Sequence, residues 1–102
     1  MSRGFGLEFS AGVKEDFKRL RAYDRRIILE AIERQLRYAP HVETKTRKRL
    51  RNLAPPFEAI PPIWQLRVGA FRVFYDVNEE ERRVAVRAVR RKPVHLNTEE
   101  IL

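Results

Sequence analysis

The sequence has 102 residues, a formal net charge of +8 at neutral pH and a hydrophobic share of 43%, which together suit one folded domain over residues 1–102 and exclude a wholly disordered chain. It contains no cysteine and only two histidines, which excludes disulfides, thiolate metal sites and cysteine nucleophiles, and we expect neither a bound metal nor a cofactor. No apolar run approaches the roughly 20 residues that span a bilayer, and no signal-type segment follows Met1, so we expect a cytoplasmic protein without a membrane partner.

The N-terminal part of the sequence predicts a short strand followed by two helices. Residues 5–9 alternate apolar with small or charged side chains, which is typical of a strand buried on one face. Ser10 stands at a helix N-cap position, and apolar residues follow it at helical spacing. Asp24 is the candidate cap of a second amphipathic helix, which Pro40 ends. A short turn near residues 22–24 makes the two helices antiparallel.

The rest of the sequence predicts a loop and then a sheet. Residues 41–62 are predicted to be irregular, because two proline pairs in the segment exclude helix and central strand. Three strands are predicted at Ile63–Val68, Phe71–Val77 and Arg83–Val89, joined by a tight turn and an acidic turn into an antiparallel meander. The predicted order is β-α-α-β-β-β. This is an α+β fold in which two N-terminal antiparallel helices pack on one face of a small antiparallel sheet and leave the other face open to solvent.

Basic residues are concentrated in two segments, 45–51 and 82–92, and the main acidic clusters lie apart from them. Most of these cations are arginines, whose planar guanidinium matches phosphate oxygens. A concentrated positive face indicates a polyanion or an acidic protein as the partner, and nucleic acid is the first candidate. The alternative is a solvated surface held together by salt bridges.

The open face of the predicted sheet carries the candidate site, because a face lined by arginines suits a bent phosphate backbone. Trp64, Phe74 and Tyr75 have two alternative roles, base stacking at this face or packing in the core. For Arg72, the alternative to a role in the site is a structural ion pair with Asp76 or with an acid on a helix. The polar side chains that alternation assigns to the open face are Gln65, Arg67, Arg72, Arg87 and Arg91.

The segment from Trp64 to Val77 reads WQLRVGAFRVFYDV. It resembles the signature of the RelE/ParE superfamily of toxins from type II toxin–antitoxin systems, which has an aromatic residue, Leu-Arg, a glycine turn, an aromatic residue, Arg, two apolar residues and Tyr. The acidic hairpin and basic strand after this segment, and the helices and the run at 48–53 before it, match in order. The similarity extends over residues 7–95 and implies a compact toxin fold with two N-terminal helices on a small antiparallel sheet.

The resemblance favours the RelE branch, whose members inhibit translation by cleaving messenger RNA on the ribosome without a metal. A ribose 2′-hydroxyl attacks the adjacent phosphate and leaves a 2′,3′-cyclic phosphate and a 5′-hydroxyl. The resemblance implies that Arg72 stabilises the phosphate charge and that a second basic residue is Lys92 or, with a register shift of one, Arg91. His95 lies where some branches place a histidine or tyrosine, and histidine is a competent acid or base near neutral pH. The substrate-binding candidates are Gln65, Arg67, Arg87, Lys45, Arg47 and Lys48.

Two departures from the RelE pattern leave other functions open. Ile63 and Gln65 stand where that pattern has lysines, and no tyrosine follows Tyr75. The first alternative is a ParE-like inhibitor of DNA gyrase, which is not a nuclease, and the second is a non-catalytic module that binds RNA or a protein partner. Every toxin-like version implies a cognate antitoxin, and the net charge of +8 favours an acidic one. We also expect residues 97–102 to form a last helical turn.

Overall fold

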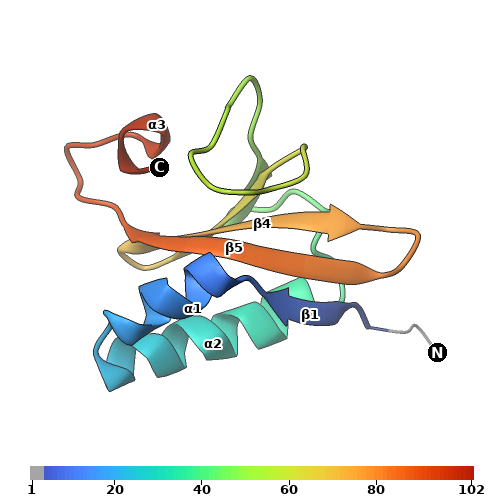
Figure 1. The fold of residues 1–102 in the computed structure, drawn as a ribbon, viewed down its shortest axis with the longest axis horizontal. Helices are drawn as coiled ribbons and strands as arrows, with labels where there is room; N and C mark the ends of the chain where they lie inside the picture. Colours follow the sequence, from blue (N-terminus) through green and yellow to red (C-terminus); the bar gives the residue numbers. More distant parts are fainter. Residues whose placement is uncertain (1–3) are drawn as a thin grey trace.

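The computed structural model describes residues 4–102, which form a five-stranded sheet with two helices on one face and a loop and the C-terminal tail on the other (Figure 1). The sheet order is β1-β5-β4-β3-β2. The predicted α+β class with two N-terminal helices on the sheet is confirmed, and so is the last helical turn. None of the helices in the described range is long and apolar enough to cross a membrane. The elements are β1 (Gly6–Phe9), α1 (Ala11–Lys18), α2 (Ala22–Leu36), β2 (Arg47–Arg49), β3 (Trp64–Val68), β4 (Phe71–Asn78), β5 (Arg83–Arg91) and α3 (Thr98–Ile101).

The first helix, α1, begins where the sequence predicts it. The Oγ atom of Ser10 accepts a hydrogen bond from the backbone N–H of Val13 (3.1 Å) and donates one to the carbonyl of Arg87 (3.1 Å), which ties the start of the helix to the sheet. The prediction that Asp24 caps the second helix is wrong, because α2 has Arg21 at its N-cap position. Asp24 lies in the first turn instead, where its carboxylate accepts from Arg21 Nε (3.2 Å) near the positive end of the helix dipole.

The sheet is larger than the predicted meander, and it is mixed. Strands β3, β4 and β5 form the meander, β1 adds a parallel strand beside β5, and β2 adds an antiparallel edge strand beside β3. The prediction that residues 41–62 are irregular is therefore wrong at Arg47–Arg49. Three consecutive basic residues show no apolar alternation, yet an edge strand tolerates them because one of its sides has no neighbouring strand.

The first core lies between the sheet and the two N-terminal helices. Alternating residues of the meander, such as Leu66 and Tyr75, point into it and meet Ile28 of α2. Trp64 also packs here, with its ring centroid 6.2 Å from that of Tyr75. Phe74 is fully buried on the opposite face. The three aromatic residues with two predicted roles therefore all belong to the core, and none is free to stack on a base.

A second, smaller core lies on the opposite face of the sheet. Phe74 packs there against Ile101 of α3 and Phe57 of the loop between β2 and β3. The buried carboxylate of Asp76 holds the same loop by accepting a hydrogen bond from the backbone N–H of Ile60 (2.9 Å). The prediction that this face is open to solvent is therefore wrong around Phe74, because the loop and the tail cover it with apolar side chains of their own.

The phenol of Tyr75 is buried and donates a hydrogen bond to the carbonyl of Pro40 (2.7 Å). Burial raises the pKa of Tyr75 above its usual value, against a smaller lowering by the charge of Arg47. We expect Tyr75→Phe to lower the free energy of unfolding by about 1–2 kcal/mol near neutral pH, because a buried carbonyl loses its donor.

Only the neutral phenol fits this core, so deprotonation of Tyr75 in the unfolded chain should lower the stability of the parent protein as pH rises above about 10. The Tyr75→Phe protein has no phenol at this position, so its stability does not depend on this deprotonation. The difference in stability between the two proteins should therefore shrink at alkaline pH. Urea unfolding of both proteins at neutral and alkaline pH checks this expectation. A difference that stays constant or widens with pH would contradict it.

Candidate functional site

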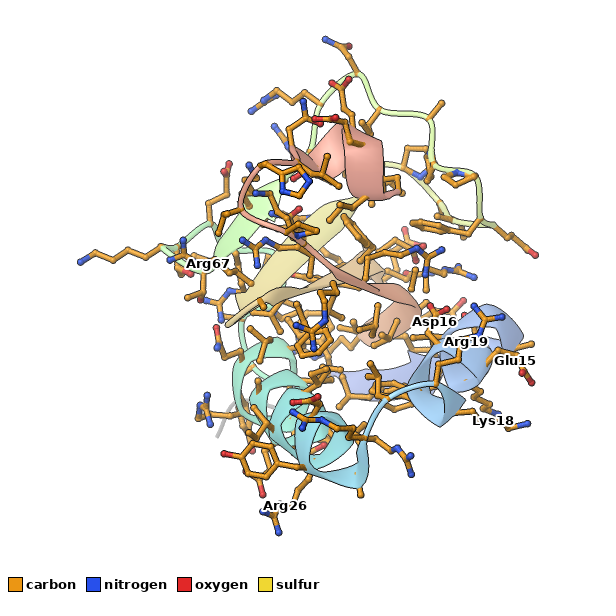
Figure 2. All side chains as sticks on the ribbon, turned by 90° about the vertical axis from the view of Figure 1, so that its left-hand side faces the viewer. Glu15, Asp16, Lys18, Arg19, Arg26 and Arg67 are labelled. Carbon is orange, nitrogen blue, oxygen red and sulfur yellow. The ribbon has the colours of Figure 1, made fainter. Side chains whose placement is uncertain are left out.

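Three arginines lie side by side across the meander. The strand register pairs Arg67 of β3 with Arg72 of β4, and Arg72 with Arg90 of β5. Asp16 of α1 binds Arg90 (Nη1 to Oδ2, 2.8 Å), whereas no carboxylate among residues 4–102 pairs with Arg67 or Arg72. Figure 2 shows Arg67 and Asp16 toward opposite edges of the sheet, so Asp16 lies at the Arg90 end of this row. Like charges that face each other across strands are destabilising, so this unneutralised pair indicates a surface that binds an anion.

The guanidinium of Arg72 is oriented by backbone carbonyls. Its Nη1 atom donates to the carbonyls of Gly69 and Phe71 (2.9 Å each). Gly69 has a φ of 57°, which glycine adopts without strain and which the tight turn between β3 and β4 requires. Partial burial and, to a lesser extent, the charge of Arg67 lower the pKa of Arg72. An arginine nevertheless stays protonated in a protein, so Arg72 offers an oriented positive charge.

A cleft of about 200 Å³ opens where Arg67 and Arg72 meet the edge strand β2 and the segment after β5. We call it the basic cleft, because six of its side chains are basic, the other four are neutral and polar, and none is a carboxylate. Without an internal counter-charge, such a cleft attracts anions. Its lining residues are Thr44, Lys45, Thr46, Arg47, Lys48, Gln65, Arg67, Arg72, Lys92 and Thr98.

Gln65 and Arg47 are among the residues of the basic cleft whose side chains are held by hydrogen bonds within the protein. Gln65 is only 5% exposed, and its Oε1 atom accepts a hydrogen bond from Thr98 Oγ1 (2.8 Å). Arg47 donates to the carbonyls of Gln35 (3.0 Å) and Val42 (3.1 Å). Both residues therefore shape the cleft, and contacts with a ligand fall to the other cations. The residues predicted for the site that line the cleft are Lys45, Arg47, Lys48, Gln65, Arg67, Arg72 and Lys92.

Two arginines predicted for the site lie outside the basic cleft. Arg87 binds the buried carboxylate of Asp76 (Nε to Oδ2, 2.8 Å), so the alternative ion pair between Arg72 and Asp76 is wrong. Arg91 lies over the ring of Phe71, 4.8 Å from its centroid, and that ring packs in the first core on the helix side of the sheet. Neither arginine lines a cavity next to Arg72.

A β-bulge places Arg90, and not the predicted Arg91, on the same face as Arg72. The register between β4 and β5 shifts between Phe74 and Tyr75, and Arg87 is the extra residue on β5. An extra residue breaks the alternation of a strand, so the residues after it change faces. Arg90 therefore joins the row with Arg72, and Arg91 turns to the helix side. The sequence of β5 is a run of valine, alanine and arginine, and nothing in this run indicates that the bulge lies at Arg87.

A larger cavity of about 640 Å³ adjoins the basic cleft and shares Lys48, Lys92 and Thr98 with it. We call it the tail cavity, because it lies between the loop after β2 and residues 92–100 of the C-terminal tail. His95 is exposed in its lining, so this predicted site residue lies beside the basic cleft and not in it. Among residues 4–102, no group of three or more His, Cys, Asp or Glu side chains is arranged to hold a metal ion.

Comparisons with known proteins agree with this fold. A family model described as the ParE toxin of the type II toxin–antitoxin system parDE matches residues 7–92. The RelBE2 toxin–antitoxin complex of Mycobacterium tuberculosis contains a chain that is 20% identical, with a TM-score of 0.70 over 87% of this chain and 99% of that one. The archaeal RelE–RelB complex of Pyrococcus horikoshii OT3 contains one that is 18% identical, with a TM-score of 0.67 over 90% and 98%. No curated protein matches the sequence at the level required of a relative.

The family match takes in both N-terminal helices and the meander that carries Arg67 and Arg72. The two solved structures show the same fold at low sequence identity. The chain therefore belongs to the ParE toxin family of type II toxin–antitoxin systems, within the RelE/ParE superfamily.

Proposed function

We propose that this toxin stops translation by cleaving messenger RNA on the ribosome, with the RNA backbone bound in the basic cleft. The observation that carries the proposal is the unneutralised pair of Arg67 and Arg72 in a cleft with six basic side chains and no carboxylate. Guanidinium groups bind phosphate oxygens through paired hydrogen bonds, and most nucleic-acid contacts of this kind go to the backbone. RNA is favoured over DNA because its 2′-hydroxyl supplies a nucleophile next to every phosphate.

The proposed reaction is a transesterification within the RNA. The 2′-oxygen attacks the adjacent phosphorus and forms a 2′,3′-cyclic phosphate, while the bond from phosphorus to the 5′-oxygen breaks. One proton leaves the 2′-hydroxyl and one is donated to the departing 5′-oxygen, so the step consumes no oxidant or reductant. Arg72 donates to the non-bridging oxygens, where negative charge builds up in the transition state. Lys92 supplies a second positive charge in the same cleft.

Lys48 offsets one departure from the RelE pattern. Gln65 stands where that pattern has a lysine, but the register of β2 and β3 pairs Lys48 with Gln65. Side chains of residues paired in this way lie on the same face of a sheet. The ammonium group of Lys48 therefore lies next to Gln65, the position where the RelE pattern has a lysine. Lys48 also lines both the basic cleft and the tail cavity, as Lys92 does.

His95 is the proposed proton carrier. It lines the tail cavity together with Lys92, one of the residues shared with the basic cleft. Imidazole both accepts and donates a proton near neutral pH, which suits a reaction that needs one proton removed and one supplied. Tyr75 does not suit this role, because its phenol is buried and bonded to the carbonyl of Pro40.

A translation extract with the purified toxin tests the proposal. We expect cuts within ribosome-bound coding sequences, with 2′,3′-cyclic phosphate and 5′-hydroxyl ends on the products. Intact messenger RNA, or products with 5′-phosphate ends, would contradict the proposal. RNA binding that weakens steeply with salt but leads to no cleavage would support a non-catalytic RNA-binding module instead.

The ParE family match favours a second candidate function, inhibition of DNA gyrase. The residues at the lysine positions of the RelE pattern, Ile63 and Gln65, agree with this candidate, and so does the lack of a tyrosine after Tyr75. A supercoiling assay with gyrase discriminates the two functions. Inhibition at micromolar toxin without RNA cleavage would replace the first candidate, and an uninhibited gyrase removes the second.

We propose a cognate acidic antitoxin as the protein partner. Both similar solved structures are toxin–antitoxin complexes. The net charge of +8 and a cleft without carboxylates favour an acidic segment that covers the cleft, because complementary charge raises the rate and specificity of association. Coexpression with the adjacent reading frame should give a heteromer on size-exclusion chromatography. Separate elution of the two proteins would contradict this partner.

A further inference from the structure

We propose that the tail cavity is a nucleobase subsite, which selects a base with an exocyclic amino group, and guanine above all, next to the phosphate in the basic cleft. The proposal rests on the proposed cleavage of RNA. It adds to that function the part of the protein that decides which sequence is cut.

The position of the tail cavity matches the order of groups in a nucleotide. Lys48, Lys92 and Thr98 line both cavities and therefore mark the junction between them. A nucleotide has a phosphate, a ribose with its hydroxyl groups and a base, in that order. With the phosphate on Arg72, the ribose lies at the junction and the base lies in the tail cavity. A volume of about 640 Å³ is ample for a base and falls in the usual range for small-molecule sites, about 300–1,000 Å³.

The apolar part of the tail cavity suits the face of a base. Leu50 and Leu96 line the cavity and also pack against the second core, so they form a fixed wall. Leu53 adds a third apolar side chain from the loop after β2. The basic cleft has no apolar lining residue at all. A change from purely polar to partly apolar lining is what the step from phosphate to base requires, because base faces are apolar and phosphates are not.

Glu99 is the carboxylate of the tail cavity that is available to read a base edge, beside the cations Lys48, Arg51 and Lys92 of the same lining. Asn97 and Glu100 bind each other's backbone in a capping box (2.9 and 3.0 Å). Thr98 donates its hydroxyl to Gln65. Glu99 is exposed and has no hydrogen bond or ion pair with the rest of residues 4–102.

A carboxylate accepts hydrogen bonds from N–H groups, whereas the ammonium and guanidinium groups in the same lining only donate them. The adjacent N1–H and N2–H groups of guanine match the two oxygens of one carboxylate. Uracil offers a single N–H group beside two carbonyls, so it is the base that this subsite should bind least well.

Fluorescence anisotropy with four short labelled RNAs tests the subsite. Each RNA is an oligouridine with G, A, C or U at one central position. We expect the parent toxin to bind the RNA with G about tenfold more tightly than the all-U RNA, since this factor lies within the range of discrimination that one good bidentate pair gives. Glu99→Gln should remove most of this difference, because an amide has only one acceptor oxygen. Glu80→Gln, in the acidic turn far from the tail cavity, is the matched control and should keep the parent's preference.

The outcomes separate this proposal from the proposed function. A parent toxin that binds none of the four RNAs would overturn the function and the subsite together. Saturable binding with equal affinity for all four RNAs would overturn the subsite alone, and so would a preference for G that Glu99→Gln leaves unchanged. A preference for G that only Glu99→Gln abolishes supports the subsite.

Discussion

Replacing Arg72 with alanine is expected to lower the rate of messenger RNA cleavage by about 100- to 1,000-fold, the usual effect of removing a donor that stabilises transition-state charge. The side chain lies next to Arg67 without a carboxylate partner, and two backbone carbonyls orient its guanidinium. Arg72→Lys keeps a positive charge but loses the planar fork, so it should lose less activity than Arg72→Ala. Product formation in the translation extract measures both variants.

Arg19→Ala is the matched control for the loss of one arginine. Arg19 is exposed on the α1 side of the molecule, away from Arg67 (Figure 2), so its removal should leave cleavage unchanged. Thermal unfolding of all variants separates loss of chemistry from loss of fold. Cleavage by a folded Arg72→Ala protein at the parent's rate would show that the reaction does not depend on this guanidinium.

Replacing Phe74 with alanine is expected to have a large effect on the stability of the fold. The Phe74 side chain is fully buried in the second core, where it packs against Phe57 of the loop and Ile101 of α3. We expect Phe74→Ala to lower the free energy of unfolding by about 3–5 kcal/mol, because it removes a large buried ring and leaves a cavity. Urea unfolding of the parent and the variant measures the difference.

The same variant should loosen the tail before the whole domain unfolds. Backbone amides of α3 are expected to exchange hydrogen faster in Phe74→Ala than in the parent, while amides of α2, which packs on the other face, should change only through the global loss of stability. Ile60→Ala is the control, because this apolar side chain is 66% exposed and its removal should cost less than about 0.5 kcal/mol. A loss below 1 kcal/mol for Phe74→Ala would mean that the second core does not hold the tail.

The helices and the meander were predictable because their signals are local and periodic. Ser10 indicates the start of α1 by its capping side chain, and alternation in β3 and β4 assigns Gln65, Arg67 and Arg72 to the face away from the helices, where they line the basic cleft. Asp24 shows the limit of such signals, since an acidic residue suits the first turn of a helix as well as its cap.

The elements that were not predicted depend on contacts between distant segments. β2 is a strand only because β3 offers it a free edge, and three basic residues have no pattern of their own to indicate this. The cover over Phe74 depends on Phe57 and Ile101, which come from segments on either side of it in the sequence. No local periodicity of the sequence predicts either arrangement.

The candidate site was predictable to the extent that it lies on regular strands. Arg67 and Arg72 were assigned to one face by alternation, and the register pairs them as neighbours. The bulge at Arg87 then reversed the faces of Arg90 and Arg91, and no local signal marks it. The adjoining tail cavity depends on how residues 92–100 return over the sheet, which alternation does not describe.

An NMR titration of the labelled toxin with a short single-stranded RNA at low salt would show whether the basic cleft binds the RNA backbone. We expect saturable shifts centred on the side-chain signals of Arg67, Arg72, Lys48 and Lys92, with little change in the α1–α2 hairpin. Shifts confined to that hairpin, or no saturable shifts at all, would contradict this expectation.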